Sequence, residues 1–280
     1  MKHLLTAVFT LLALGISASA QEIVMPQKGV CAHRGDHSRC PENTVPAFVA
    51  AVKRNVEMVE MDIRYTKDKK LVILHDLTVD RTSNGTGKIA DLTFDEVRAL
   101  DFGIKRGEEF RGTQIPTLDE ALAVLPKNIW LNLHLGGGKE LALEVAETVV
   151  RTGRVHQAFL ACGREAQQAV HEKYPQILLC NMQRWTPDKT YAETTLAWKC
   201  SFLQPTHMAL ENGEEMVGYK IQSPKTGEVV PPLTYAELQR LKKAGVKVNF
   251  FHAETAEMAK KLFDAGVDFV LTDNLSALGK

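Results

Sequence analysis

The chain has 280 residues, of which 45% are hydrophobic, so it carries enough apolar material for a substantial core. Its 34 Lys and Arg residues balance its 34 Asp and Glu residues. This neutrality gives no indication of nucleic acid or an anionic membrane face as a partner. Any anion that the protein binds should therefore be small and held locally.

The first 20 residues have the pattern of a secretory signal, with a basic start at Lys2, an apolar run over Leu4–Ile16 and small residues up to Ala20. An apolar run of about 13 residues is too short to span a bilayer. We expect cleavage before Gln21, which leaves residues 21–280 as the mature protein. Because residue 21 is not Cys, we expect no stable membrane anchor, and we expect the protein to be exported, either periplasmic or secreted.

The cysteines leave two interpretations open. Their number is odd and no C-x-x-C zinc spacing occurs, although an exported chain is able to form disulfides. Either Cys31 and Cys40 form a bridge, or the thiols are free and buried. The five residues are Cys31, Cys40, Cys162, Cys180 and Cys200.

Short apolar, β-rich runs alternate with amphipathic helical patterns from residue 25 to the end. Eight strands are predicted, at Gly29–His33, Glu57–Arg64, Ile129–Leu135, Gln157–Ala161, Ile177–Asn181, Ser201–Leu203, Val246–Phe251 and Phe269–Leu271. Helical patterns between them include Val45–Arg54, Glu140–Thr152, Thr234–Ala244 and Thr255–Ala265. No linker or low-complexity stretch divides residues 21–280, so one domain is expected.

Eight strands interleaved with helices predict an α/β fold, a (β/α)8 TIM barrel. The stretch Thr66–Thr117 is too long for a simple connection and predicts an insertion after the second strand. An open doubly wound sheet is the main alternative, but the G-x-G-x-x-G turn expected after its first strand is absent.

The second predicted strand carries two acids inside an apolar run. Residues two apart in a strand face the same way, so Glu60 and Asp62 should point to the barrel axis while Val59, Met61 and Ile63 point to the helices. Two carboxylates at i and i+2 can share one divalent cation, which would also offset the cost of burying them.

The sequence after this strand, TKDKKLVILH, predicts a hairpin that returns towards the two acids. A turn centred between Lys67 and Asp68 would place Asp62 opposite Ile73 and Glu60 opposite His75. This register brings the His75 imidazole beside the carboxylates, whereas a slip by one residue would turn it to the other face.

The first predicted strand ends in His33 and Arg34, followed by Gly35 at the corner where the chain leaves the sheet. Two imidazoles, a guanidinium for phosphate oxygens and a carboxylate-held metal at one rim form a coherent phosphoryl-transfer site. One imidazole can take the nucleophile's proton while the other protonates the leaving oxygen.

Seven short pieces of the sequence occur in the order and with the residues of a known family. They are His33-Arg34-Gly35, Pro41-Glu42-Asn43-Thr44, Glu60-x-Asp62, His75-Asp76, Arg81-Thr82, Gly266-Val267-Asp268 and Thr272-Asp273. In these pieces the chain resembles the glycerophosphodiester phosphodiesterase family, over nearly the whole mature length.

The resemblance implies a TIM barrel with an insertion after the second strand, and a small-molecule glycerophosphodiester as substrate. It also implies metal-dependent hydrolysis to glycerol 3-phosphate and an alcohol. His33 and His75 would be the acid–base pair, and Glu60 and Asp62 would bind one divalent ion, Mg²⁺ or Ca²⁺. Glu42 would support the first loop as a partner of Arg34.

The third predicted strand, WLNLHLGGGK, departs from the family pattern N-I-E-I-K. His134 occupies the position of the family Glu and Gly136 that of the Lys, and Asn132 shares a face with His134 as a supporting residue. An imidazole ligand would either shift the preference towards Mn²⁺ or Zn²⁺ or weaken metal binding altogether. Lys139 starts a helix whose N–H groups can also face an anion, and it could replace the missing cation as a phosphate contact.

Two other functions remain open from the sequence. The same catalytic parts would give a cyclic phosphate if an internal hydroxyl attacked, as in the related venom phospholipases D. The altered third strand would also suit a non-catalytic phosphodiester-binding protein. Asp273 follows the last strand, where it either caps the structure or contacts the site. The leaving alcohol and the oligomeric state are not indicated.

Overall fold

The eight predicted strands form a closed parallel barrel in the computed structural model, which describes residues 23–222, 227 and 229–280. The expected signal segment, residues 1–20, lies outside the described residues. In spatial order the barrel strands are β1 (Gly29–Ala32), β2 (Met58–Tyr65), β4 (Trp130–Leu135), β5 (Ala158–Cys162), β6 (Leu178–Asn181), β7 (Phe202–Leu203), β10 (Lys247–Phe251) and β11 (Phe269–Thr272). Strand β1 pairs with both β11 and β2, which closes the ring and confirms the predicted (β/α)8 barrel.

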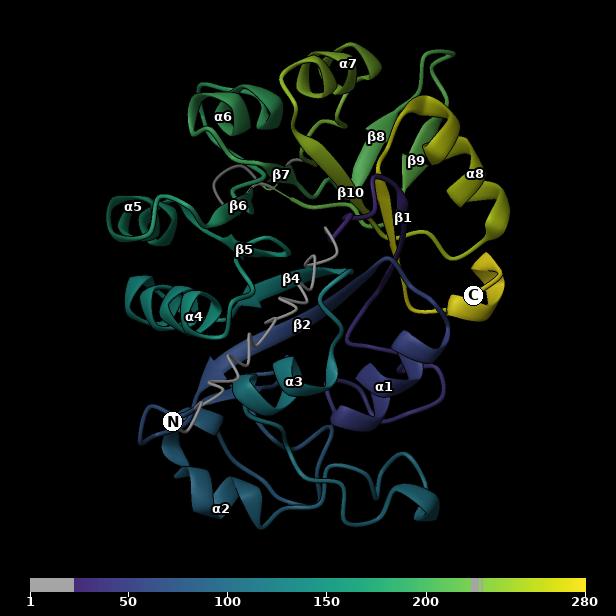
Figure 1. Ribbon diagram of the computed structural model, residues 1–280. Helices are drawn as coiled ribbons and strands as arrows, with labels where there is room; N and C mark the ends of the chain where they lie inside the picture. Colours follow the sequence, from purple (N-terminus) through teal and green to yellow (C-terminus); the bar gives the residue numbers. More distant parts are fainter. Residues whose placement is uncertain (1–22, 223–226, 228) are drawn as a thin grey trace, which may run out of the picture.

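Helices surround the strands in Figure 1, and most begin at a threonine. The helices are α1 (Val45–Lys53), α2 (Phe94–Arg98), α3 (Leu118–Val124), α4 (Lys139–Arg151), α5 (Arg164–Lys173), α6 (Tyr191–Ala197), α7 (Tyr235–Lys243) and α8 (Ala256–Ala265). Helices α2, α3, α6 and α7 each start with a Thr-x-x-Glu capping box, in which the Thr side chain and the Glu side chain satisfy backbone N–H groups reciprocally. Such caps contribute about 1 kcal/mol each and fix where the helices start.

Strand β2 shows how the sequence directs its side chains. Val59, Met61 and Ile63 are fully buried in the large apolar cluster between the strands and the helices. Glu60 and Asp62 alternate with them and point into the barrel, as predicted, at the end where parallel strands have their carboxyl termini.

The opposite end of the barrel is filled by aromatic rings. Trp130 packs edge-on against Phe202 and Phe269, and Phe159 stacks on Phe202 at 3.8 Å between ring centroids. The indole of Trp130 also donates a hydrogen bond to the carbonyl oxygen of Pro26. The barrel interior is therefore packed at this end and can present polar groups only at the other.

The predicted insertion lies between β2 and α3 and has its own small apolar cluster. Its first element, β3 (Leu71–Ile73), runs antiparallel to β2, but the predicted register is wrong: Ile63, and not Asp62, lies opposite Ile73. The turn has three residues instead of two, because Thr66 and Lys70 close it and Lys69 takes a left-handed conformation with φ 62°.

A second antiparallel pair, β8 (His207–Ala209) with β9 (Glu215–Val217), lies in the connection between β7 and α7. All five cysteines are free, so a Cys31–Cys40 bridge is not formed. Cys31 points into the packed barrel interior, whereas Cys40 lies in the loop before α1.

Candidate active site

A cavity of about 210 Å³ opens at the C-terminal end of the barrel. It brings together six of the residues selected from the sequence: His33, Arg34, Glu60, Asp62, His75 and His134. The other lining residues are Met182, Arg184, Gln204, Thr206, Tyr219, Ile221, Phe251 and Leu271. Two imidazoles from different segments therefore share one mouth with the buried acids, and we call this cavity the catalytic pocket.

Glu60, Asp62 and His134 form a cluster in which one ligand atom of each lies within 4.8 Å of the others. Neighbouring strands set this arrangement, because Asp62 on β2 is in register with His134 on β4. The His134 Nδ1 lies 3.0 Å from an Asp62 oxygen and 3.9 Å from a Glu60 oxygen. His134 thus occupies the place where the family resemblance expects a Glu ligand.

The electrostatics of this cluster suit a divalent cation. Burial raises the pKa of Glu60 well above its usual value, and the charge of Asp62 raises it further. Burial also acts to raise the pKa of Asp62, but the hydrogen bond with His134 and the nearby charges of His134 and Arg34 outweigh it and lower the pKa. Two buried carboxylates with one imidazole form an O,O,N donor set, and a bound cation would offset their repulsion.

His33 is held by a carboxylate that comes from the other end of the chain. Its Nδ1 is hydrogen-bonded to Asp273, which follows β11, and the Asp273 oxygen also lies 2.8 Å from His37 Nε2. Burial lowers the pKa of His33, while the bond to Asp273 opposes this effect. With Nδ1 paired to a carboxylate, the free Nε2 faces the pocket, where it lies 3.9 Å from Glu60.

His75 is held in the same manner, by Asp76. The two are joined by a hydrogen bond of 2.7 Å between Nδ1 and a carboxylate oxygen. The register slip does not remove His75 from the pocket, because β3 ends at Ile73 and the strand alternation no longer applies. Arg64 fixes the backbone at this point by donating from Nε to the His75 carbonyl oxygen at 2.8 Å.

Arg34 and Glu42 form the predicted contact, with a distance of 2.9 Å between the guanidinium and the carboxylate. Arg81 of the insertion binds the same Glu42 carboxylate, at 2.6 and 2.8 Å, and also Asp76. Burial alone would raise the pKa of Glu42, but the two guanidinium groups lower it. Arg34 lies 3.5 Å from Asp62 through its Nε, so its charge is directed at the acidic cluster.

Three of the predicted residues do not line the catalytic pocket: Glu42, which reaches it through Arg34, and Asn132 and Lys139. Asn132 is fully buried inside the barrel, where its amide donates to Gln204 at 3.0 Å, so it supports the pocket floor through a pocket residue. Lys139 is exposed, lines a neighbouring cavity and lies 3.8 Å from Glu165. The position of Lys139 gives no support to its predicted contact with the scissile phosphate.

Sequence reasoning did not assign three residues in or beside the catalytic pocket. Asp273 was left undecided between a cap and a site contact, and in the structure it bonds to His33 and His37. Arg184 and Tyr219 reach the pocket from connections that carry no motif. The Thr272-Asp273 piece was the available signal for Asp273, whereas no pattern in the sequence marked the other two.

The fold and the site define a barrel hydrolase, and comparisons with known proteins give its family. A family model described as the glycerophosphoryl diester phosphodiesterase family matches residues 33–277. The chain is also 32% identical over 250 residues to the glycerophosphodiester phosphodiesterase of Caldanaerobacter subterraneus, covering 89% of this chain and 95% of the relative. The chain belongs to the glycerophosphodiester phosphodiesterase family.

Solved structures agree with this assignment. A phosphodiesterase from Oleispira antarctica, determined in complex with the product sn-glycerol-3-phosphate, superposes with a TM-score of 0.70 at 26% identity and covers 91% of this chain and 96% of its own. The glycerophosphodiester phosphodiesterase of Agrobacterium tumefaciens has a TM-score of 0.70 at 22% identity, covering 90% of this chain and 98% of its own, and supports the fold alone. Within the described residues, the helices lack the length and apolar character needed to cross a membrane.

Proposed function

We propose that this phosphodiesterase hydrolyses a glycerophosphodiester to glycerol 3-phosphate and an alcohol, with His33 and His75 as the acid–base pair. The observation that carries the proposal is the common arrangement of the two imidazoles. Each is bound through Nδ1 to a carboxylate, His33 to Asp273 and His75 to Asp76, and both line the pocket that contains the acidic cluster. This pairing fixes the tautomer and leaves Nε2 to exchange a proton with the substrate.

Glu60, Asp62 and His134 are the residues that would hold one divalent ion. The family typically uses such an ion, and the buried, mutually repelling carboxylates of this chain fit one. When bound, the ion supplies a Lewis acid for the phosphoryl oxygens. Because His134 replaces a carboxylate with an imidazole, we propose a preference for Mn²⁺ or Zn²⁺ over Mg²⁺ or Ca²⁺.

The protein's own side chains then account for positioning and proton transfer. Arg34, held by Glu42, presents its guanidinium to a phosphate oxygen beside the acidic cluster. One imidazole accepts a proton from the attacking water, and the other donates a proton to the leaving alcohol oxygen. Water adds to phosphorus as the bond to that oxygen breaks, so a diester and water give a phosphate monoester and an alcohol.

The product complex of the Oleispira relative supports this choice of product, since that protein binds sn-glycerol-3-phosphate. Membership of a hydrolase family disfavours the non-catalytic alternative. The alternative in which an internal hydroxyl attacks differs from hydrolysis only in the nucleophile, and the product decides between them.

A reaction in ¹⁸O-labelled water, followed by phosphorus NMR, tests the proposal. Glycerophosphocholine, glycerophosphoethanolamine and glycerophosphoinositol are each incubated with Mg²⁺, Ca²⁺, Mn²⁺ or Zn²⁺. We expect labelled glycerol 3-phosphate, with Mn²⁺ or Zn²⁺ most effective, and product formation at least about a hundredfold slower with His33→Ala. Accumulation of an unlabelled cyclic ester would show that an internal hydroxyl attacks instead of water. Absence of product with every metal would refute the proposed activity.

We also propose that the chain acts after export, on the basis of the signal-like pattern in residues 1–20. Mass analysis of the protein recovered from the periplasm or medium should give a mature form that begins at Gln21. Retention of Met1 in a cytoplasmic protein would overturn this localisation.

A further inference from the structure

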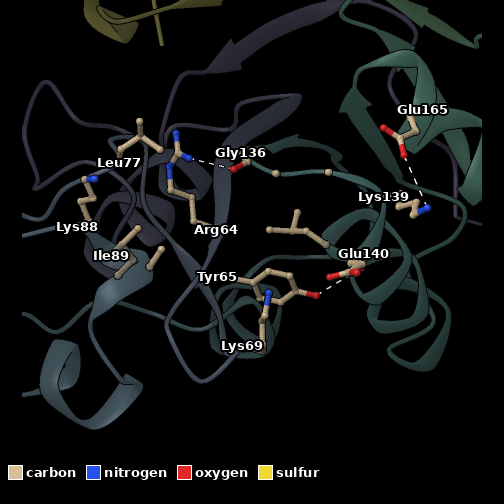
Figure 2. A pocket seen from close by; sticks show the side chains of 14 residues that line it. Arg64, Tyr65, Lys69, Leu77, Lys88, Ile89, Gly136, Lys139, Glu140 and Glu165 are labelled. Carbon is tan, nitrogen blue, oxygen red and sulfur yellow. Dashed lines mark hydrogen bonds and ion pairs between the residues drawn. The ribbon is translucent and has the colours of Figure 1, made fainter.

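A second and larger cavity, of about 640 Å³, lies at the same end of the barrel, and we call it the rim groove. Figure 2 shows it between the insertion, which contributes Leu77 and Lys88, and the start of α4, where Lys139 lies. Arg64 of β2 stands between these two sides in the figure. None of its lining residues lines the catalytic pocket, so the established site does not account for it.

The rim groove adjoins the catalytic pocket. Three chain segments line both cavities with residues two positions apart: Asp62 and then Arg64, His134 and then Gly136, His75 and then Leu77. On β2 the side chains of such residues point to the same side of the strand, and Gly136 directly follows β4. A molecule bound over the acidic cluster can therefore extend past these segments into the groove.

The glycine at position 136 leaves room for the Arg64 side chain between the two cavities. A Cβ atom at position 136 would lie 2.6 Å from the Arg64 guanidinium, so the guanidinium occupies the space of a side chain there. Arg64 donates to the Gly136 carbonyl oxygen at 3.0 Å and to that of His75. The replacement of the family Lys by glycine thus coincides with a cation from β2 at the junction of the two cavities.

The lining charges favour an anion. Four cationic side chains and two acidic ones line the groove: Arg64, Lys69, Lys88, Lys139, Glu140 and Glu165. Glu165 is already 3.8 Å from Lys139. In the described part of the chain, neither Lys69 nor Lys88 has a carboxylate within ion-pair distance, and the Lys69 amine instead lies 4.9 Å from the centre of the Tyr65 ring.

The backbone adds donors on the α4 side. This helix begins after Gly138, which provides no side-chain cap. Among the described residues, the backbone N–H groups of residues 137–141 have no acceptor, and all five of these residues line the groove. The rim groove therefore combines unpaired N–H groups with an excess of positive charge.

We propose that the rim groove binds the leaving alcohol of the substrate and selects glycerophosphodiesters whose alcohol carries a further phosphate group. This inference rests on the proposed function. The proposal assigns protonation of the leaving oxygen to His75: this residue lines the pocket and its segment continues into the groove, so the alcohol would lie towards Arg64 and the α4 N-terminus. Water cleaves the diester as described above, and the second phosphate remains on the departing alcohol.

Two substrates that differ in the charge of the alcohol test the proposal. Bis(glycerophospho)glycerol carries a second phosphate beyond the scissile bond, whereas glycerophosphocholine carries a quaternary ammonium group. We expect the wild-type kcat/KM to be higher for bis(glycerophospho)glycerol. The quantity compared between variants is the ratio of the two kcat/KM values, the charge-selectivity ratio.

Gly138→Asp places a carboxylate at the mouth of the α4 N–H groups. Position 138 has open space and an extended backbone, and Asp is a favourable N-cap, so the variant should fold at least as stably as the wild type. We expect the charge-selectivity ratio to fall about tenfold, through KM. The new carboxylate would accept hydrogen bonds from the α4 N–H groups and would repel the second phosphate of the substrate. Gly163→Asp is the matched control, since Gly163 is the open, uncapped N-cap of α5 and lines neither cavity.

Lys88→Ala should lower the charge-selectivity ratio about threefold, as expected for one exposed charge. Lys53→Ala removes an exposed charge from the C-terminal end of α1, at the opposite end of the barrel, and should leave the ratio as in the wild type. Ratios that stay within about twofold of the wild type in both Gly138→Asp and Lys88→Ala would overturn the proposal.

Titration calorimetry with His33→Ala protein separates this inference from the proposed function. Bis(glycerophospho)glycerol should bind more tightly to His33→Ala than to the double variant that also carries Gly138→Asp. If the wild type hydrolyses neither substrate but this difference in binding persists, the proposed function fails and the anion groove stands. Hydrolysis without a difference in binding refutes the groove alone.

Discussion

The two halves of the barrel mouth differ in the kind of residue they contribute. Strands β11, β1, β2 and β4 carry the acids and the histidines, from His33 and the Glu60–Asp62 pair to His134, with Asp273 directly after β11. The half formed by β5, β6, β7 and β10 faces the same pocket mainly with uncharged residues such as Met182 and Phe251, and with Arg184 as its cation. The acids and imidazoles are thus concentrated where neighbouring strands hold them in register, and the other half contributes shape and one guanidinium.

This contrast predicts that the largest losses come from the two imidazoles. Replacing His33 or His75 with Ala should lower kcat by about 10²- to 10⁴-fold, because proton transfer to or from the reacting oxygens is lost. The half-buried His156, whose side chain bonds to the Lys127 carbonyl oxygen and lines neither cavity, provides the control. Steady-state assays in which His33→Ala keeps more than about a tenth of the activity would assign proton transfer elsewhere.

Removing an acid should abolish the response to metal. Addition of Mn²⁺ should raise the melting temperature of the wild type, because an ion that binds only the folded state stabilises it. Glu60→Gln should not respond. Calorimetric scans with and without chelator measure this shift, and an undiminished shift in Glu60→Gln would show that the ion binds at another place.

The same scans test the cost of burying Glu60. The pKa of Glu60 is raised in the folded chain, so its ionisation penalises folding at every pH above the ordinary carboxyl pKa. In chelator at neutral pH, Glu60→Gln should therefore be at least as stable as the wild type. A clearly lower melting temperature for the variant would mean that the ionised carboxylate is stabilising without metal.

A smaller effect is expected for Asp273, which acts through His33. Asp273→Asn should lower kcat about 10- to 100-fold with little change in KM, because the amide no longer fixes the tautomer of His33. The pH dependence of kcat should also shift, which a purely structural role would not cause. Asp273→Glu should recover part of the loss. Equal activity of Asp273→Asn and wild type would remove this positioning role.

The smallest effect is expected for the apolar residues in the half of the mouth formed by β5, β6, β7 and β10. Met182→Leu conserves volume on the pocket wall and should change kcat by less than about twofold, with any effect confined to KM. The kcat and KM of Met182→Leu and Asp273→Asn should be measured side by side with glycerophosphocholine. A large fall in kcat would show that this half takes part in the chemistry.

The sequence predicted the charged half well because its signals are local. Alternation along β2 gives the direction of Glu60 and Asp62, and parallel pairing then places His134 beside Asp62. The predicted hairpin register was wrong, because the turn length depends on the left-handed conformation of Lys69. Gly or Asn usually occupies such a position, so a lysine there gave no signal. His75 still reaches the pocket, because Arg64 of the paired strand β2 holds its carbonyl oxygen and the neighbouring Asp76 holds its ring.

The half formed by β5, β6, β7 and β10 was less predictable, because most of its pocket residues come from connections whose path is set by packing. Arg184 donates to the Gln204 carbonyl oxygen across the top of β6 and β7, a contact between residues 20 positions apart in the chain. No periodicity encodes such a contact. Lys139 was misplaced for a related reason, because a position at a helix start does not reveal which of two adjoining cavities it faces.

The free cysteines give the protein an internal reporter of unfolding. Burial raises the pKa of Cys162 and Cys200 to about 12 and that of Cys31 and Cys180 well above the usual value, so these four carry almost no thiolate at neutral pH. Alkylating reagents attack the thiolate. Burial also raises the pKa of Cys40, but its side chain is only half-buried, so it should react first in the native state. Modification of the other four would time the opening of the barrel itself.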